Sequence, residues 1–291
     1  MHAEEIRSWR EFDDAVAGAN REGPRADRVH SSLVFRGLAR SSYSNRHSLA
    51  RLGEDYHGLE RHLIRNFRKY AHRERPGPTV WDWLSLAQHH GLPTRLLDWT
   101  FSPFIAAHFA TATSPDQEAI VWAVDCAGAH ELLPDDVRRS LGDEGATVFT
   151  TELLAQHAPT LDELERIARG EKPFVLFFEP PSLDDRIVNQ SAVLSTLSDP
   201  EASMDDWIEQ HPDCCHAWRI TPGAKAEIRD RLDQANITER VLMPGLDGLA
   251  TWLRRYYAPG RAPSDLREGG GAMSAPLHTG TTQGEQEERA A

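Results

Sequence analysis

The residues best suited to chemistry gather in one stretch, residues 81–110. Its aromatic and ionisable side chains include Trp81, Trp83, His89, His90, Arg95, Asp98 and Trp99, with Gly91 and Pro93 as turn residues. A segment this rich in such groups is costly to order unless the groups satisfy one another. Two interpretations stay open. In one, Arg95 pairs with Asp98 and holds a loop over Trp99. In the other, the stretch is the wall of a preorganised pocket, with tryptophan for stacking and histidine for proton transfer.

A metal site is a further interpretation of the same stretch. His89, His90, Asp98 and His108 offer nitrogen and oxygen ligands of the kind found in metal-dependent nucleases and phosphatases. Adjacent histidines seldom point at one ion, and no HxH or HxxxH spacing accompanies them. We therefore expect no metal. His89 and His90 are expected to end a helix, where the helix dipole favours them, with one of the two facing the pocket.

Charge limits the partners of the chain. The formal net charge is −13, which argues against wholesale binding to duplex nucleic acid. Residues 61–75, RHLIRNFRKYAHRER, run against this trend. Arg61, Arg65, Arg68 and Lys69 recur there at helical spacing, so a solvated helix face is the simpler interpretation and contact with phosphate or RNA is the alternative.

The composition is typical of a soluble globular protein in a reducing compartment. Hydrophobic residues make up 40% and charged residues 26% of the 291 residues. The first twenty residues lack the features of a signal peptide, and no apolar run reaches the roughly 20 residues that span a bilayer. Three cysteines are too few for a disulfide framework, and adjacent Cys214 and Cys215 are expected to be apolar fillers entering a strand. A cytoplasmic protein without membrane contact is expected.

The elements that position these residues are predicted from periodicity and caps. Helices are expected over 3–18, 55–73, 80–90, 103–109, 160–169, 221–232 and 246–257, and strands over 32–35, 119–124, 173–178, 189–197 and 214–220. Helices and strands interleave without a regular βαβ rhythm, so we expect an α+β fold with a small, mostly antiparallel sheet flanked by several helices. One domain is expected over residues 4–257, followed by a disordered tail over 258–291.

Two motifs carry a family resemblance. Phe35-Arg36-Gly37 ends an expected strand, and residues 88–100 form the run QHHGLPTRLLDWT. Together they resemble the FRG domain, which is named for its Phe-Arg-Gly motif. The resemblance extends through Arg186, Gln190 and the segment MPGLDGLA at 243–250, so it covers roughly residues 4–257.

The same residues bear a fainter similarity to ADP-ribosyltransferases of the Arg–Ser–Glu type. Those enzymes carry an Arg-Gly at the end of the first strand, then a Ser-Thr-Ser strand, and later a glutamate on another strand. Here Arg36-Gly37 resembles the first element and residues 99–102 the second, and Gln190 falls where the glutamate would lie. The sequence departs from the pattern there, because glutamine carries no negative charge. Glu179, at the end of an expected strand, is an alternative carboxylate.

The similarity to these transferases implies an NAD site. Its catalytic residues would be Arg36, Thr100, Gln190, His89 and His90, and its cofactor-binding residues would be Arg36, Gly37, Trp99, Thr100 and Ser102. In this scheme the guanidinium grips the pyrophosphate, the glycine lets the backbone come close, and the hydroxyls and Gln190 orient the nicotinamide ribose. A histidine would assist proton transfer.

The implied function is that of an ADP-ribosyl transferase or NAD glycohydrolase, acting as a toxin or anti-phage effector. NAD would be its substrate or ligand, and a protein or a nucleic acid its acceptor. A module that senses a nucleotide or a partner without catalysis is one alternative. A metal-dependent nuclease or phosphatase is the other.

Overall fold

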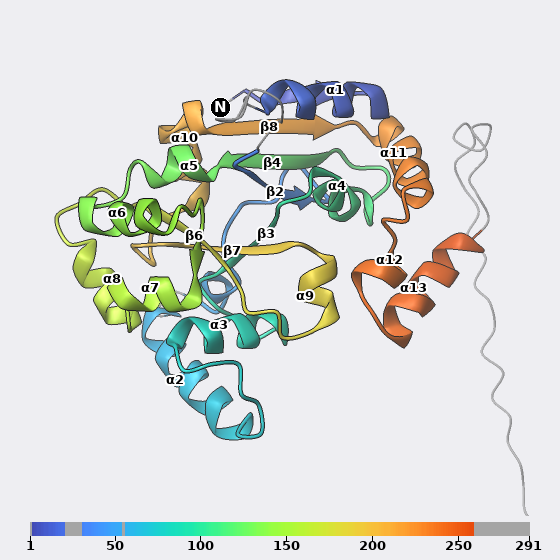
Figure 1. The fold of residues 1–291 in the computed structure, drawn as a ribbon. Coiled ribbons are helices and arrows are strands. Elements are labelled where there is room, and N and C mark those ends of the chain that lie inside the picture. Colours follow the sequence, from blue (N-terminus) through green and yellow to red (C-terminus); the bar gives the residue numbers. More distant parts are fainter. Residues whose placement is uncertain (1, 21–30, 54–55, 259–291) are drawn as a thin grey trace, which may run out of the picture. The chain divides into compact units, whose positions relative to one another are not determined.

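The computed structural model describes residues 2–20, 31–53 and 56–258 (Figure 1). Residues up to Trp252 form one compact unit, and the end of the last helix, from Leu253 onward, belongs to a second unit. The tail predicted over 258–291 lies outside the described residues except for Ala258. Within the described part, no helix combines the length and the apolar character needed to cross a membrane.

One eight-stranded sheet carries the fold, in the order β1-β8-β4-β2-β3-β7-β6-β5. Its strands are β1 (Glu4–Ile6), β2 (Leu33–Leu38), β3 (Leu97–Thr100), β4 (Ala119–Asp125), β5 (Phe149–Thr150), β6 (Val175–Glu179), β7 (Ala192–Leu197) and β8 (Cys215–Ile220). The pairs β1–β8 and β5–β6 at the two edges are parallel, and the pairs between them are antiparallel. The expected α+β class and the mostly antiparallel sheet are therefore confirmed.

Helices surround the sheet (Figure 1). They are α1 (Trp9–Ala19), α2 (Tyr56–Tyr70), α3 (Val80–His89), α4 (Pro103–Thr111), α5 (Cys126–His130), α6 (Asp135–Glu144), α7 (Thr151–His157), α8 (Leu161–Ile167), α9 (Asp185–Asn189), α10 (Met204–Gln210), α11 (Pro222–Gln234), α12 (Glu239–Leu242) and α13 (Leu246–Tyr256), with 3-10 turns η1 (Leu49–Arg51) and η2 (Pro212–Cys214). Helices α3 and α4 begin as predicted. Thr79 and Asp82 form a capping box at the start of α3. Ser102 caps α4, with Pro103 as its first residue.

Several elements were not predicted from the sequence pattern, namely helices α5, α6, α7, α9, α10 and α12, strand β5, and two further short strands. The helix expected from residue 3 begins only at Trp9, because Glu4–Ile6 pairs with β8 as an edge strand and Ser8 then caps the helix. The segment Leu97–Thr100, which lies in the predicted loop, is strand β3 and pairs with β7 over its whole length. Strands of three or four residues show too little alternation to be recognised without their partners.

The sheet opens between its two central strands. β2 pairs with β4 along all six of its residues, from Leu33 to Leu38. In contrast, the register between β2 and β3 joins a single pair, Phe35 with Thr100. Beyond this pair, the end of β2 and the beginning of β3 are not paired with each other. The two strands therefore flank a gap in the sheet.

Helix α4 packs directly on β2, and Gly37 makes this contact possible. A Cβ atom at Gly37 would lie 1.9 Å from the carbonyl oxygen of Ala106 in α4. Any larger residue would therefore push the helix off the strand. The glycine of the Phe-Arg-Gly motif is thus required by helix-on-sheet packing, whatever else binds nearby.

Candidate functional site

A cavity of about 420 Å³ lies where β2 and β3 diverge, and α3, α4 and α9 complete its wall. Its polar wall includes Arg36, Gln88, His89, Asp98, Thr100, Arg186 and Gln190. Its apolar wall includes Leu38, Ala106, Phe109, Ile187 and Leu194. Small-molecule sites of about 300–1,000 Å³ share this character, with an apolar lining and a few convergent polar groups. We call this cavity the gap pocket.

Arg36 reaches across the gap from β2 to β3. Its Nη1 donates a hydrogen bond of 2.7 Å to the backbone oxygen of Asp98, whereas its Nε is buried without a partner. Burial lowers the pKa of the guanidinium, and the Asp98 carboxylate opposes this shift. The group still carries its charge at neutral pH. A desolvated cation whose Nε–H has no acceptor is unfavourable, so an anion beside the half-buried Arg36 guanidinium would stabilise it.

Asp98 is the acidic residue among those that line the gap pocket. Its Oδ2 accepts a hydrogen bond of 2.9 Å from Gln88 Nε2. Gln88 is itself held by Thr94, whose hydroxyl donates to Gln88 Oε1 at 2.5 Å. Thr94 is fully buried, so this chain of hydrogen bonds fixes the Asp98 carboxylate at the cavity surface.

The two histidines at the end of α3 have different surroundings. His89 lines the gap pocket, and its Nε2 lies 2.6 Å from Asp184 Oδ2. Burial lowers the pKa of His89, and the Asp184 carboxylate counteracts part of this shift. His90 is the C-cap residue of α3, and its ring lies 6.4 Å from that of Phe67 in α2 and 5.2 Å from that of His89. It is not among the residues that line the pocket. Of the predicted pair, His89 is therefore the one at the pocket.

Thr100 and Gln190 both line the gap pocket, and both already have protein partners. The Thr100 hydroxyl donates to the backbone oxygen of Gln190 at 2.7 Å. The side-chain Nε2 of Gln190 donates to the backbone oxygen of Leu242 at 2.9 Å. Ser102 is not among the lining residues, since its hydroxyl caps α4. These contacts hold β3, α9 and α12 together.

Trp99 lines the gap pocket, yet its indole is only 3% exposed. The indole Nε1–H donates to Ser195 Oγ at 2.8 Å, and the ring packs edge-on against Phe177. The side chain is therefore a core residue beneath the pocket wall, as the scaffold interpretation of this stretch predicted, and its faces are not open for stacking on a base.

Arg186 and Tyr43 belong to the pocket wall and were given no role from the sequence. Arg186 lies in the short helix α9 and is exposed. Tyr43 lies in the loop after β2, with Arg40 stacked on its ring at 5.6 Å. Neither residue has a local pattern that marks it, apart from the weak extension of the family motif through Arg186. The fold brings both to the gap pocket.

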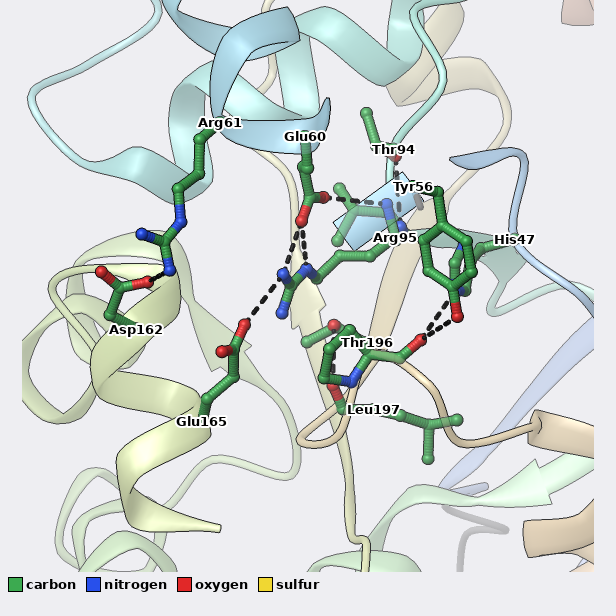
Figure 2. Close-up of polar contacts among 12 residues, drawn as sticks. His47, Tyr56, Glu60, Arg61, Thr94, Arg95, Asp162, Glu165, Thr196 and Leu197 are labelled. Atoms are coloured by element: carbon green, nitrogen blue, oxygen red, sulfur yellow. Dashed lines mark hydrogen bonds and ion pairs between the residues drawn. The ribbon is translucent and has the colours of Figure 1, made fainter. Parts of the chain in front are cut away.

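Arg95 does not pair with Asp98, so the pairing offered by the first interpretation was wrong. Arg95 belongs to a buried ion cluster (Figure 2), in which Glu60 Oε2 accepts from its Nε at 2.6 Å and Glu165 Oε1 lies 3.1 Å from its Nη2. Side-chain exposure is 2% for Arg95 and 1% for Glu60. The cluster ties α2 and α8 to the segment before β3, so Arg95 supports the pocket wall from behind.

The residues considered as metal ligands do not come together. His108 is buried in α4, where its Nδ1 lies 3.3 Å from the backbone oxygen of Ile237 and 3.1 Å from Arg229 Nη1. His89 and Asp98 are at the gap pocket, and His90 faces α2. Among the described residues, no group of three or more His, Cys, Asp or Glu has an arrangement that would hold a metal ion.

Comparison with known proteins gives one match. The family model of the FRG domain matches residues 31–119, a segment that contains β2, α2, α3, β3 and α4. No curated protein and no solved structure shows significant similarity to the chain. The matched segment includes both predicted motifs, and it supplies the two strands that flank the gap pocket. Residues 31–119 of the chain therefore match the FRG domain.

Proposed function

We propose that the gap pocket binds NAD through its pyrophosphate, and that the protein cleaves NAD by ADP-ribosyl transfer or hydrolysis. The observation that carries the proposal is the buried, unpartnered Nε of Arg36 in a cavity of about 420 Å³. Arginine offers a planar fork that matches phosphate oxygens, and a phosphate there would satisfy a donor that the protein leaves unused.

A second cation supports a phosphate ligand. Arg186 stands on another wall of the gap pocket, and among the described residues its guanidinium has no carboxylate partner. Two arginines from different elements, β2 and α9, suit the two phosphates of a dinucleotide better than a single anion. The apolar wall, with Leu38, Ala106 and Phe109, is suited to a base.

Asp98 is the group that we assign to the reacting ribose. NAD cleavage breaks the bond between ribose C1′ and the nicotinamide nitrogen, and the electron pair leaves with nicotinamide. The ribose then carries an oxocarbenium charge, which a fixed carboxylate stabilises. Gln190 supplies no such charge, and Glu179 is not among the lining residues. The Gln88 hydrogen bond preorganises Asp98 for this role.

His89 is the group that we assign to the acceptor. Because burial lowers its pKa, the imidazole is neutral near pH 7. A neutral ring that donates Nε2–H to Asp184 keeps its lone pair on Nδ1. As the acceptor oxygen bonds to ribose C1′, its proton passes to Nδ1. Water as the acceptor gives hydrolysis, and a hydroxyl of another molecule gives transfer.

The sensing alternative is favoured by one observation. Helix α9 lines the gap pocket and is also bonded to α12, through Asn189 Nδ2 to Val241 O at 2.8 Å and Gln190 Nε2 to Leu242 O at 2.9 Å. A ligand that draws Arg186 inward would therefore pull on α12. A protein that binds NAD without cleaving it would favour this alternative.

The test is NAD binding by calorimetry, together with nicotinamide release, for the wild type, Arg36→Ala and the control Arg138→Ala. Losing two charge-assisted hydrogen bonds should weaken binding by about 3 kcal/mol, or roughly 100-fold. Arg138 lies on α6, where it pairs with Asp135, so its variant should bind like the wild type. No binding by the wild type at millimolar NAD would refute the proposal.

The carboxylate assignment has its own test. Asp98→Asn should keep NAD affinity within about 3-fold but lower the rate of nicotinamide release by about 10²–10³, the cost of removing one preorganised electrostatic group. Glu179→Gln should leave the rate unchanged, because Glu179 lies at the end of β6 outside the pocket wall. The opposite result for the two variants would assign the catalytic carboxylate to Glu179.

A further inference from the structure

A basic surface stands out on α2 and the link that follows it. We define the α2 basic face as Arg65, Lys69, Tyr70, Arg73 and Arg75. All five residues are exposed, and Tyr70 is 76% exposed. Within the face, Lys69 Nζ lies over the Tyr70 ring at 5.5 Å from its centroid. Residues 61–75 contain six Arg and Lys against one Glu, in a chain whose net charge is −13. The charge is therefore concentrated locally against the overall trend.

The cations of this face are free of acidic partners. Arg61, by contrast, pairs with Asp162, and Arg68 lies over the ring of Trp83 at 5.0 Å. Across residues 2–20, 31–53 and 56–258, the structure gives no salt bridge to Arg65, Lys69, Arg73 or Arg75. None of these four charges is neutralised by a salt bridge, so they are available to an external anion.

The opposite side of α2 anchors the face. Glu60 is fully buried against Arg95, and Ile64 is 7% exposed in the core cluster that includes Trp81. Arg65 and Lys69 are four residues apart and so share one side of the helix. In Figure 1, α2 lies outside α3 at the edge of the molecule, with α3 between it and the sheet. The charges are thus presented on a rigid support.

We propose that the α2 basic face binds single-stranded nucleic acid. Phosphates pair with the free cations, and a base stacks on Tyr70. The exposed ring favours a single strand, because its bases offer open faces, whereas a duplex keeps them stacked inside. An acidic protein segment or an anionic membrane would use the charges but would not use the exposed aromatic residue. The inference does not depend on what the gap pocket binds.

The experiment measures fluorescence anisotropy of a labelled single-stranded RNA of about 12 nucleotides, titrated with the full chain. With four phosphates neutralised, the logarithm of the affinity should fall with a slope of about −2.8 against the logarithm of salt concentration. Between 50 and 200 mM salt this corresponds to a loss of about 50-fold. Tyr70→Ala should weaken binding by about 10-fold, and Tyr70→Phe should retain it.

A charge-matched pair of variants completes the test. One variant carries glutamine at Arg65, Lys69, Arg73 and Arg75, and the control carries glutamine at the exposed residues Arg10, Arg139, Arg169 and Arg231. The first should lose RNA binding and lower the salt slope toward zero, whereas the control should keep both. Equal losses in the two variants would mean that net charge alone acts, which overturns the proposal.

Other ligands complete the comparison. Tighter binding to duplex DNA, to polyglutamate or to vesicles containing anionic phospholipid than to the single strand would also overturn the proposal. So would an absence of RNA binding at 50 mM salt, provided that circular dichroism shows the protein to be folded.

Discussion

Replacing Glu60 with glutamine should destabilise the protein more than the same change at Glu165, although both carboxylates contact Arg95. Glu60 is 1% exposed and Glu165 is 21% exposed at the side chain. Glu60 also accepts the backbone N–H of Arg95 at 3.2 Å as well as its Nε at 2.6 Å. The substitution keeps the shape but turns an amide N–H₂ toward a buried cation.

The magnitude follows from burial. Breaking a buried ion pair costs about 3–5 kcal/mol. Because Glu165 keeps one contact with Arg95 in the variant, we expect the lower end, about 3 kcal/mol, for Glu60→Gln. Glu165 is partly solvated, so Glu165→Gln should cost about 1 kcal/mol. In a domain of this size, a loss of 1 kcal/mol lowers the melting temperature by about 2–4 °C. The melting temperature should therefore fall by about 6–12 °C for Glu60→Gln and by about 2–4 °C for Glu165→Gln.

The assay is thermal and urea unfolding at pH 7, with a double-variant cycle. Arg95→Met alone leaves Glu60 buried without its cation and should cost about 3–5 kcal/mol. Adding Glu60→Leu to it should recover part of that loss, since an apolar pair fills the same space without an uncompensated charge. Equal shifts for Glu60→Gln and Glu165→Gln, or additive effects of Glu60→Leu and Arg95→Met, would refute the argument that the buried pair anchors α2 to the pocket wall.

Three further predictions concern packing, pH and thiol reactivity. Gly37→Ala should destabilise the protein by about 3 kcal/mol, because the added Cβ meets a backbone oxygen of α4. Gly142→Ala, where the added Cβ meets open space, should stabilise the protein by about 0.5–1 kcal/mol. Urea unfolding measures both effects. Burial lowers the pKa of the His130 ring to about 4. The unfolded chain therefore binds a proton at His130 more readily than the folded protein does, and the free energy of unfolding should fall by about 3 kcal/mol from pH 6.5 to pH 4. An NMR titration that gave this ring a pKa near 6.5 in the folded protein would contradict the prediction. Burial raises the pKa of Cys215 to about 12, so this thiol should resist Ellman's reagent at pH 8 until the protein unfolds; rapid modification in the folded state would disagree.

Much of the local structure could be predicted from the sequence, because its causes lie within a few residues. The cap at Thr79 with Asp82 three residues later, and Ser102 followed by Pro103, mark the two helices beside the gap pocket. The two motifs also pointed to one surface, and Arg36, His89 and Asp98 do line one cavity. These features depend on hydrogen bonds and spacings that the chain carries along its own length.

The partners of the charged residues could not be predicted in the same way. One interpretation of the sequence paired Arg95 with Asp98, three residues away, but Arg95 pairs with Glu60, 35 residues away. Both carboxylates suit an arginine chemically, and only the packing of α2 decides which is buried beside it. The sequence likewise allowed Gly37 to be assigned to ligand contact, whereas in the structure α4 packs directly against this residue.

The sequence by itself determined the class of fold, the family motifs and the basic character of residues 61–75, since composition and short-range spacing carry them. Only the tertiary structure decided that β3 is a strand, that it meets β2 at a single residue pair, and that Arg186 from α9 joins Arg36 there. Strand pairing and pocket walls bring together residues far apart in the chain. Which residues meet depends on how the whole core packs, and no local pattern encodes that outcome.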